Sequence, residues 1–282
     1  MSDINFSPRS QAIKTQLQAT YNQAADYFDS APLTLWDHCG RRTVELSEVR
    51  PGDRVLDLCC GSGASALAAA ERAGQAGHVL GIDLAERLLA LARAKAEARN
   101  LTNLEFRVGD VTRLEAERAA YDAVVCVFGL FFAPDMVATL AELWEAVRPG
   151  GMLCVTTYGS CLFEPANTLY WEAIGAERPE LRPARFAQDA IAEPPRLRRL
   201  YRDAGAADPE IDLETLAQPM TPEDFWTVVL GTGHRMPIDL MGAAAGERVR
   251  SALLGRLREA RVTSVRTDVL YARATKPIEG AP

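Results

Sequence analysis

The residues of this sequence that could carry out chemistry gather in Arg54–Ser65, which reads RVLDLCCGSGAS. The stretch contains an acid, Asp57, two adjacent cysteines and a glycine-rich run. The cysteines could be a redox or metal pair, whereas Gly61–Ala66 fits the dinucleotide fingerprint G-x-G-x-x-G/A. The acid upstream of the glycines suggests a third possibility, a loop that holds a different adenosine-containing ligand.

The spacing of the six cysteines argues against a metal or disulfide role. None of them has the C-x-x-C or Cys/His spacing of zinc ligands. Most lie inside apolar, strand-like runs, as expected of buried thiols in a reducing cytoplasm. We therefore expect no metal ion. We also expect a cytoplasmic protein, because the first residues contain no apolar signal-peptide segment.

The glycine-rich run lies between a strand-like and a helix-like segment, and this alternation continues to about residue 158. Short apolar runs separated by helical segments are typical of βαβ units and a mainly parallel sheet. We therefore predict a doubly wound α/β core over residues 46–158. Ligands of such sheets bind beyond the carboxyl ends of the strands.

Outside this core the pattern is more helical. We expect residues 1–45 to form an N-terminal helical lid. Residues 159–282 should complete the sheet and add substrate-binding insertions at 159–193 and 218–262, which would extend the lid.

Three acids distinguish the possible ligands. Asp83 ends the second strand, where an acid binds ribose hydroxyls of either kind of ligand. Asp57 would repel a pyrophosphate but could lie near the cationic amino group of a methionine moiety. Asp110, after the third strand, is placed to accept a hydrogen bond from an adenine amine, and Val111 can offer its backbone N–H to the ring.

Five segments, in order, resemble the motifs of the class I S-adenosylmethionine-dependent methyltransferases: VLDLCCGSG, GIDL, GDVTRL, YDAVVCVFGLFF and VRPGGML. The resemblance covers residues 20–158 well and the rest loosely. FGLFFAPD is similar to the ubiquinone/menaquinone C-methyltransferase branch and related small-molecule enzymes. The resemblance implies a seven-stranded, mainly parallel, Rossmann-like sheet and S-adenosyl-L-methionine as the cofactor.

Carried over residue by residue, the resemblance implies a site for each part of the cofactor. The residues are Asp57, Cys59 and Gly61 at the methionine end, Asp83 and Leu84 at the ribose and adenine, Asp110 and Val111 at the adenine edge, and Val127 and Phe128 beneath the methyl donor. The chain departs from the family at one position, because members most often have glycine in place of Cys59.

The candidate for a general base or substrate ligand is His234, because it lies among glycines in the second insertion. The apolar run CVFGLFFAP stands where a metal-dependent catechol-type enzyme would have carboxylates. Aromatic side chains in the N-terminal and post-sheet segments could stack on a planar acceptor. We expect methyl transfer to a small, aromatic or apolar molecule, with oxygen as the first choice of acceptor atom and carbon or nitrogen after it.

Two other classes stay open. A non-catalytic, S-adenosylmethionine-binding regulatory protein would share the same fold. An NAD-dependent oxidoreductase would use Gly61–Ala66 for a dinucleotide. The net charge of −7 argues against a nucleic-acid partner, and no apolar run is long enough to cross a bilayer. We expect a monomer or a homodimer.

Overall fold

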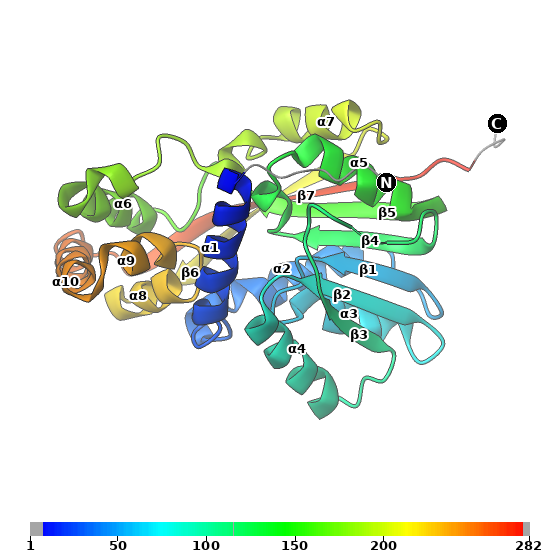
Figure 1. Cartoon of the computed structure of the whole chain (residues 1–282), viewed down its shortest axis with the longest axis horizontal. Helices are drawn as coiled ribbons and strands as arrows, with labels where there is room; N and C mark the ends of the chain where they lie inside the picture. The colour runs from blue at the N-terminus through cyan, green and yellow to red at the C-terminus, as the bar shows by residue number, and fades with distance from the viewer. Residues whose placement is uncertain (1–7, 115, 279–282) are drawn as a thin grey trace.

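A seven-stranded sheet lies at the centre of the computed structural model, which describes residues 8–114 and 116–278 (Figure 1). The strands are β1 (Arg54–Leu58), β2 (His78–Asp83), β3 (Leu104–Val108), β4 (Tyr121–Val127), β5 (Val147–Tyr158), β6 (Glu210–Pro219) and β7 (Ser264–Thr275). Their order in the sheet is β3-β2-β1-β4-β5-β7-β6. The pairs from β3 to β5 are parallel, and β7 is antiparallel to both β5 and β6. The predicted doubly wound, mainly parallel sheet is confirmed.

Helices cover both faces of this sheet. The core helices are α2 (Leu35–Leu46), α3 (Ala64–Ala73), α4 (Glu86–Ala98), α5 (Met136–Ala146) and α7 (Pro194–Asp203). Figure 1 shows α3 and α4 on one side of the sheet and α5 and α7 on the other. α2 packs against α3, β4 and β5, so it is a core helix, although residues 1–45 were expected to be a lid. The part of that segment left to act as a lid is α1 (Pro8–Ala24) and the chain up to the short helix η1 (Ala31–Leu33).

A second group of helices forms a cap, at the left of Figure 1. The cap helices are α6 (Ala166–Glu177), α8 (Pro222–Leu230), α9 (Arg235–Met241) and α10 (Ala243–Glu259), and short helices elsewhere are η2 (Leu130–Phe132), η3 (Pro179–Leu181) and η4 (Ala187–Ala190). α10 contacts the other three cap helices, and α1 contacts both α9 and α4. α1 therefore bridges the cap and the core. Among the described residues, no helix is both long and apolar enough to span a membrane.

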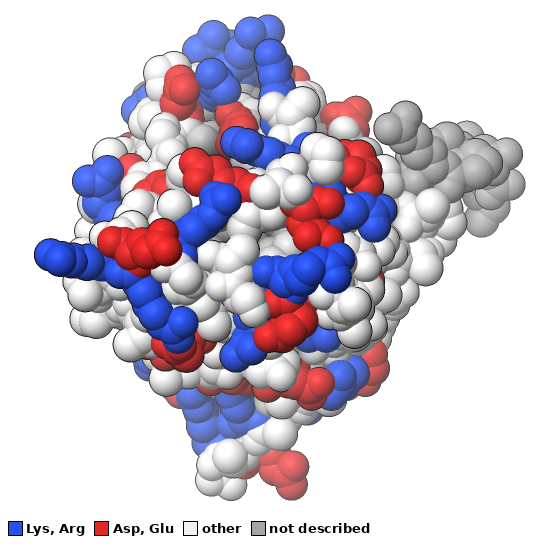
Figure 2. Space-filling model, turned by 90° about the vertical axis from the view of Figure 1, so that its left-hand side faces the viewer, with Lys and Arg blue, Asp and Glu red and all other residues white. Residues whose placement is uncertain are grey.

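The outer face of the cap carries charges of both signs. Figure 2 shows Lys and Arg side chains interleaved with Asp and Glu over this face. Arg248 pairs with Glu177, and Arg256 pairs with Glu172 at 3.0 Å, so both pairs join α10 to α6. Exposed ion pairs of this kind contribute at most about 1 kcal/mol each. The apolar contacts between the helices therefore hold the cap together.

The burial of each strand follows from its place in the sheet. β1 and β4 are central and covered on both faces, so they are nearly continuous apolar runs. β6 is an edge strand and leaves the Leu213 side chain 61% exposed. Asp57 breaks the pattern, because it lies in β1 and is 0% exposed. Aspartate is almost never fully buried without a partner, so the end of β1 is where a site is expected.

β1 ends in a turn with a glycine-like backbone. Cys59, Gly61 and Gly63 have positive φ angles of 59°, 54° and 90°. Such a conformation costs a non-glycine residue roughly 1–2 kcal/mol, and Cys59 adopts it at the position where the family resemblance implies glycine. A Cβ added to Gly129, after β4, would lie 2.3 Å from the Cys59 Cβ. The turns after β1 and β4 therefore fit together only with glycine at position 129.

We expect Gly129→Ala to lower the free energy of unfolding by about 1–3 kcal/mol, as overpacking does in protein cores. Gly255→Ala is the matched control, because a Cβ at that helical position meets no atom within 4 Å. Urea unfolding measures both variants. Since the clash is with Cys59, the double variant Cys59→Gly/Gly129→Ala should regain most of the lost stability. Wild-type stability of Gly129→Ala would contradict this packing.

Candidate functional site

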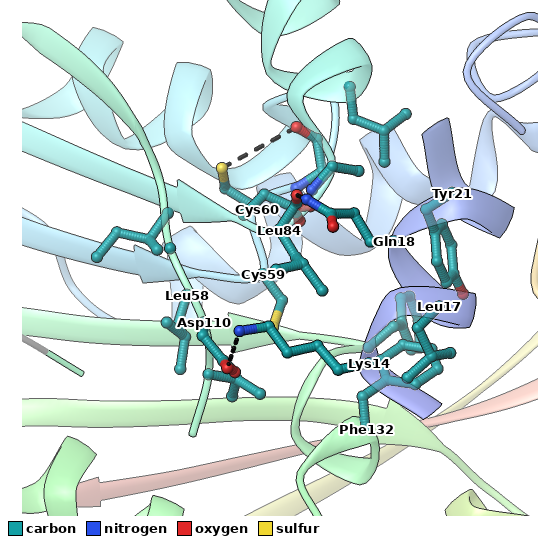
Figure 3. Close-up of a pocket in the computed structure, with 18 of the residues that line it drawn as sticks. Lys14, Leu17, Gln18, Tyr21, Leu58, Cys59, Cys60, Leu84, Asp110 and Phe132 are labelled. Atoms are coloured by element: carbon teal, nitrogen blue, oxygen red, sulfur yellow. Dashed lines mark hydrogen bonds and ion pairs between the residues drawn. The ribbon is translucent and has the colours of Figure 1, made fainter. Parts of the chain in front are cut away.

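A cavity of about 230 Å³ lies at the carboxyl ends of β1, β2 and β4, beneath α1. Figure 3 shows Lys14, Gln18 and Tyr21 along α1, with Cys59 and Asp110 on the opposite side of the cavity. The predicted cofactor residues that line the cavity are Cys59, Gly61, Asp83, Leu84, Asp110, Val111, Val127 and Phe128. The structure thus brings together residues from four separate strand ends.

Asp83, the last residue of β2, joins two turns of the cavity wall. One carboxylate oxygen accepts a hydrogen bond from the Gly61 backbone N–H at 2.9 Å, and the other accepts one from the Ala85 N–H at 2.8 Å. Burial raises the pKa of Asp83, and these backbone hydrogen bonds oppose the shift. Each carboxylate oxygen can accept a second hydrogen bond. Asp83 is therefore able to bind a pair of hydroxyl groups in the cavity while it holds the two turns.

The glycine-rich turn is also held by the chain that follows α1. The Ser62 hydroxyl donates to Asp29 at 2.6 Å, and the Lys95 ammonium of α4 donates to Ser62 at 2.9 Å and to Asp29 at 3.0 Å. A Cβ on Gly61 would lie 3.4 Å from the Phe28 ring. The N-terminal segment therefore packs directly on the turn after β1.

Asp57 lies behind the cavity wall. Its Oδ2 accepts a hydrogen bond from the Ser65 hydroxyl at 2.6 Å, and Ser65 itself lines the cavity. Its Oδ1 is buried without a hydrogen-bond partner among the described residues. Burial raises the pKa of Asp57 to about 7, although the Ser65 hydrogen bond lowers it. Contact between Asp57 and a methionine amino group stays a prediction, and in this arrangement Ser65 stands between the carboxylate and the cavity.

Asp110 is paired with a lysine that the sequence did not single out. Lys14 Nζ lies 2.6 Å from Asp110 Oδ2, the contact dashed in Figure 3, and the Thr112 N–H donates to Oδ1 at 2.9 Å. Burial alone would raise the pKa of Asp110, but the hydrogen bonds from Lys14 and Thr112 outweigh burial and hold the pKa below its usual value. An adenine amine at this carboxylate would have to share it with Lys14 or displace the ammonium.

Gln18 of α1 was also missed by the sequence analysis, whereas Tyr21 was expected among the aromatic side chains of the lid. Gln18 Nε2 donates to the Leu84 carbonyl at 3.1 Å, so α1 is hydrogen-bonded to the end of the β2 turn. Lys14, Gln18 and Tyr21 stand at i, i+4 and i+7, which is one face of a helix. That spacing was readable in the sequence. The spacing alone does not predict that this face of α1 covers the cavity, because the docking of α1 depends on residues far along the chain.

The far end of the cavity is aromatic. The Phe128 ring stacks on Tyr158 with centroids 4.3 Å apart. Trp36 meets the Phe128 ring edge-on at 5.4 Å and stacks on Phe28 at 5.8 Å. Phe128 has a φ of 53°, which is unusual for a bulky residue. Stacking in this cluster holds Phe128 in that backbone conformation at the cavity wall.

The insertions contribute less to this cavity than expected. Of the described residues after 158, only Thr232 lines it, while residues 11–36 form much of the wall. Tyr170 and Trp171 of α6 pack against each other at 4.9 Å inside the cap. The expectation that 159–193 supplies the pocket wall is therefore wrong for this cavity, because its aromatic side chains form the core of the cap.

His234 lies within the cap, behind Thr232. Its Nε2 is 2.8 Å from Asn167 Oδ1, and its Nδ1 is 3.0 Å from Thr232 Oγ1. Burial lowers the pKa of His234 to about 4, so the ring is neutral near pH 7. Its role as a general base stays a prediction. Both ring nitrogens have partners in the cap, and His234 does not line the cavity.

The adjacent cysteines pack in the cavity wall as free thiols. A hydrogen bond with Cys126 and burial raise the pKa of Cys59, and burial raises that of Cys60. Both side chains are therefore protonated thiols, which are poor nucleophiles and poor metal ligands. Within the described ranges, no three His, Cys, Asp or Glu side chains are arranged to hold a metal ion.

Residues 55–151 match a family model described as a methyltransferase domain. The chain is 36% identical over 137 residues to a demethylmenaquinone methyltransferase of Bacillus cereus (strain ATCC 10987 / NRS 248), which covers 48% of this chain and 58% of the relative. It is 33% identical over 144 residues to the aklanonic acid methyltransferase DauC of Streptomyces sp. (strain C5). This match covers 51% of this chain and 66% of the relative. The chain thus matches about three-fifths of the length of these curated relatives.

Solved structures share the fold over nearly the whole chain. The YcgJ protein of Bacillus subtilis superposes with a TM-score of 0.56 at 16% identity, covering 86% of this chain and 99% of that chain. The [4+2]-cyclase SpnF superposes with a TM-score of 0.55 at 20% identity. The superposition covers 96% of this chain and 95% of the SpnF chain. Likeness at these identities shows the fold alone, and this fold hosts more than one kind of chemistry.

The buried Asp57 carboxyl should make stability depend on pH. Its pKa is about 7 in the folded chain and near 4 when unfolded, so the folded state binds the proton more tightly between these values. Stability from this group is present below about pH 4 and is lost as pH rises towards 7. Asp57→Asn has no such loss.

We therefore expect Asp57→Asn to gain stability relative to wild type by roughly 2–3 kcal/mol between pH 5 and pH 8, at about 1.4 kcal/mol per pKa unit. Urea unfolding without ligand at both pH values measures the difference. A constant difference across this range would show that Asp57 titrates normally.

Proposed function

We propose that the chain is a class I S-adenosylmethionine-dependent methyltransferase that transfers a methyl group from S-adenosyl-L-methionine to a small aromatic or apolar molecule. The proposal starts from the methyltransferase domain that residues 55–151 match and from the order of the seven strands. The observation that carries the proposal is the cavity wall, which combines the glycine-rich turn, Asp83 and Asp110 at one end with aromatic rings at the other. A nucleoside and an apolar acceptor would meet in this cavity.

The residues present fit the nucleoside cofactor. Asp83 has carboxylate lone pairs left for two ribose hydroxyls after it has bound Gly61 and Ala85. The positive φ angles at Gly61 and Gly63 turn the backbone so that a ligand can approach it without a Cβ in the way. Asp110, Val111 and Leu84 all line the cavity, and the chain after β3 is hydrogen-bonded to the end of β2 through Gly109 N–H and the Asp83 carbonyl at 3.0 Å. The adenine would therefore follow the ribose along this edge of the sheet.

When bound, the cofactor supplies a methyl group already activated by its sulfonium. The task of this chain is then to bind, orient and exclude water. Val127 and Phe128 form the wall next to Cys59 and would place the acceptor in line with the methyl group. Orientation of this kind can lower a barrier by as much as about 7–11 kcal/mol.

The acceptor is proposed from the aromatic end of the cavity. Planar molecules stack well on rings such as those of Phe128 and Trp36. The two curated relatives are named for demethylmenaquinone and aklanonic acid. We propose an acceptor with a conjugated ring, with oxygen as the first choice of methylated atom and carbon or nitrogen as the others.

The alternatives are distinguished by ligand binding. Thermal unfolding should shift upwards with S-adenosylmethionine and with S-adenosylhomocysteine, but not with NAD, because ligands that bind only the folded state stabilise it. A shift with NAD alone would favour the oxidoreductase alternative. Binding of both sulfur nucleosides without methyl transfer to any of a broad panel of phenols, quinols and aromatic acids would favour a regulatory protein.

Asp83→Ala should weaken S-adenosylhomocysteine binding by about 100-fold or more. Hydrogen bonds to charged groups are worth about 1.5–3 kcal/mol each, and two ribose hydroxyls lose their acceptor. Glu97→Ala, which removes an exposed carboxylate from α4, is the matched control and should bind normally. Isothermal titration calorimetry measures both. Undiminished binding by a folded Asp83→Ala variant would remove Asp83 from the site.

A further inference from the structure

The aromatic end of the cavity contains a hydroxyl that the protein does not use as a donor. Tyr21 of α1 lines the cavity, with its ring 5.5 Å from Phe132 and 6.5 Å from Phe28. A Cβ on Gly233 would lie 3.3 Å from Tyr21 Oη, so the hydroxyl lies where the cap meets α1. Among the described residues, no hydrogen bond has the Tyr21 hydroxyl as its donor.

Other hydroxyl and amine groups in the wall already donate hydrogen bonds to acceptors of the protein. Ser62 donates to Asp29, Ser65 donates to Asp57, and Lys14 pairs with Asp110. Thr232 donates to the Val228 carbonyl at 2.8 Å, which is a bond within its own helix end. Two donors at this end are therefore left for a ligand, the Tyr21 hydroxyl and the Trp36 indole N–H, which is buried without a hydrogen-bond partner among the described residues. A tyrosine hydroxyl in such a site usually has a partner.

Tyr21 is suited to donate a proton in a hydrogen bond but not to remove one. Burial raises the pKa of Tyr21 far above its usual value, and the nearby Asp83 and Cys59 raise it further, while a hydrogen bond from the Gly233 backbone opposes them. The phenol is therefore un-ionised near pH 7. A protonated phenol has an O–H to donate, so it suits an incoming oxygen lone pair.

The described wall offers no free general base to an acceptor. Its titratable side chains are Lys14, Tyr21, Cys59, Cys60, Asp83, Asp110 and Arg113. Asp110 is neutralised by Lys14, Asp83 is hydrogen-bonded to two turns at the nucleoside end, and the cysteines are protonated thiols. His234 has both ring nitrogens bound inside the cap. An acceptor that needs a base to become a nucleophile would find none here.

We infer that the methyl acceptor is a planar aromatic molecule that enters the cavity already deprotonated, as a phenolate, carboxylate or enolate, and that the Tyr21 hydroxyl binds its anionic oxygen. This inference rests on the proposed function and narrows its substrate class. Tyr21 is then the residue that selects the acceptor and orients it, and no proton transfer to the protein is required.

The transfer step balances without a base. The proton of the acceptor leaves to solvent before binding. An electron pair on the anionic oxygen, or on the carbon conjugated with it, forms the new bond to the methyl carbon. The S–CH₃ bond breaks and its electron pair stays on sulfur, so the sulfonium becomes a neutral thioether and the anion becomes a neutral methylated product.

Two naphthoquinones of matched shape test this inference: 2-hydroxy-1,4-naphthoquinone, which is an anion at neutral pH, and 2-methoxy-1,4-naphthoquinone, which has no acidic proton. Calorimetry at pH 7.5 with saturating sinefungin, whose amine stands in for the sulfonium, gives the dissociation constant of each. The hydroxy probe should bind at least about tenfold more tightly, and Tyr21→Phe should remove about tenfold of that affinity, as loss of one hydrogen bond to a charged group does.

Tyr27→Phe is the matched control, because Tyr27 is 36% exposed and lies outside the cavity wall. It should leave both probes unaffected, and both variants should bind sinefungin within about twofold of wild type. Equal affinity for the two probes, no effect of Tyr21→Phe, or failure of the hydroxy probe to bind while sinefungin binds would overturn the inference. Failure of sinefungin to bind wild type would instead count against the proposed function.

Discussion

The geometry of this site depends on one carboxylate that spans two turns. Asp83 binds the backbone of Gly61 after β1 and of Ala85 after β2, so the ends of two parallel strands cannot separate. The glycine-rich turn can be held in this way because its backbone has positive φ angles at several positions. Gly129 lets the turn after β4 close against Cys59. Three strand ends are thereby locked into one wall before any ligand arrives, which reduces the entropy lost on binding.

The N-terminal segment completes the wall by contacts of a different kind. Lys14, Gln18 and Asp29 reach the core through an ion pair and hydrogen bonds, whereas α2 is packed into the core by apolar contacts. Polar contacts at the edge of a cavity are weaker than a buried core and exchange readily with water or a ligand. A ligand group at the Asp110 carboxylate would compete with Lys14, so the Lys14 contact of α1 is coupled to the nucleoside end.

The two ends of the cavity have opposite chemistry. The nucleoside end has carboxylates and backbone N–H groups, each already oriented by a partner. The acceptor end has aromatic rings and a phenol that burial keeps protonated. In the proposed reaction, an anionic acceptor at the apolar end would be attracted strongly to the cationic sulfonium of the cofactor, because little water would screen the two charges. In such a site, orientation and charge attraction can lower the barrier to methyl transfer without a general base.

The sequence by itself determined the sheet and the positions at its binding edge. Alternating apolar runs specify parallel strands, and glycines and acids at strand ends are local features. Gly61, Asp83, Asp110 and Phe128, which the sequence placed at the binding edge of the sheet, line the cavity. The tertiary structure alone decided what faces them. Lys14, Tyr21 and Thr232 are distant in sequence from the strand ends, and His234 turns into the cap, because their orientations depend on how whole helices dock. The sequence pattern encodes which face of a helix is apolar, but the partner that covers it is chosen by packing of the complete chain.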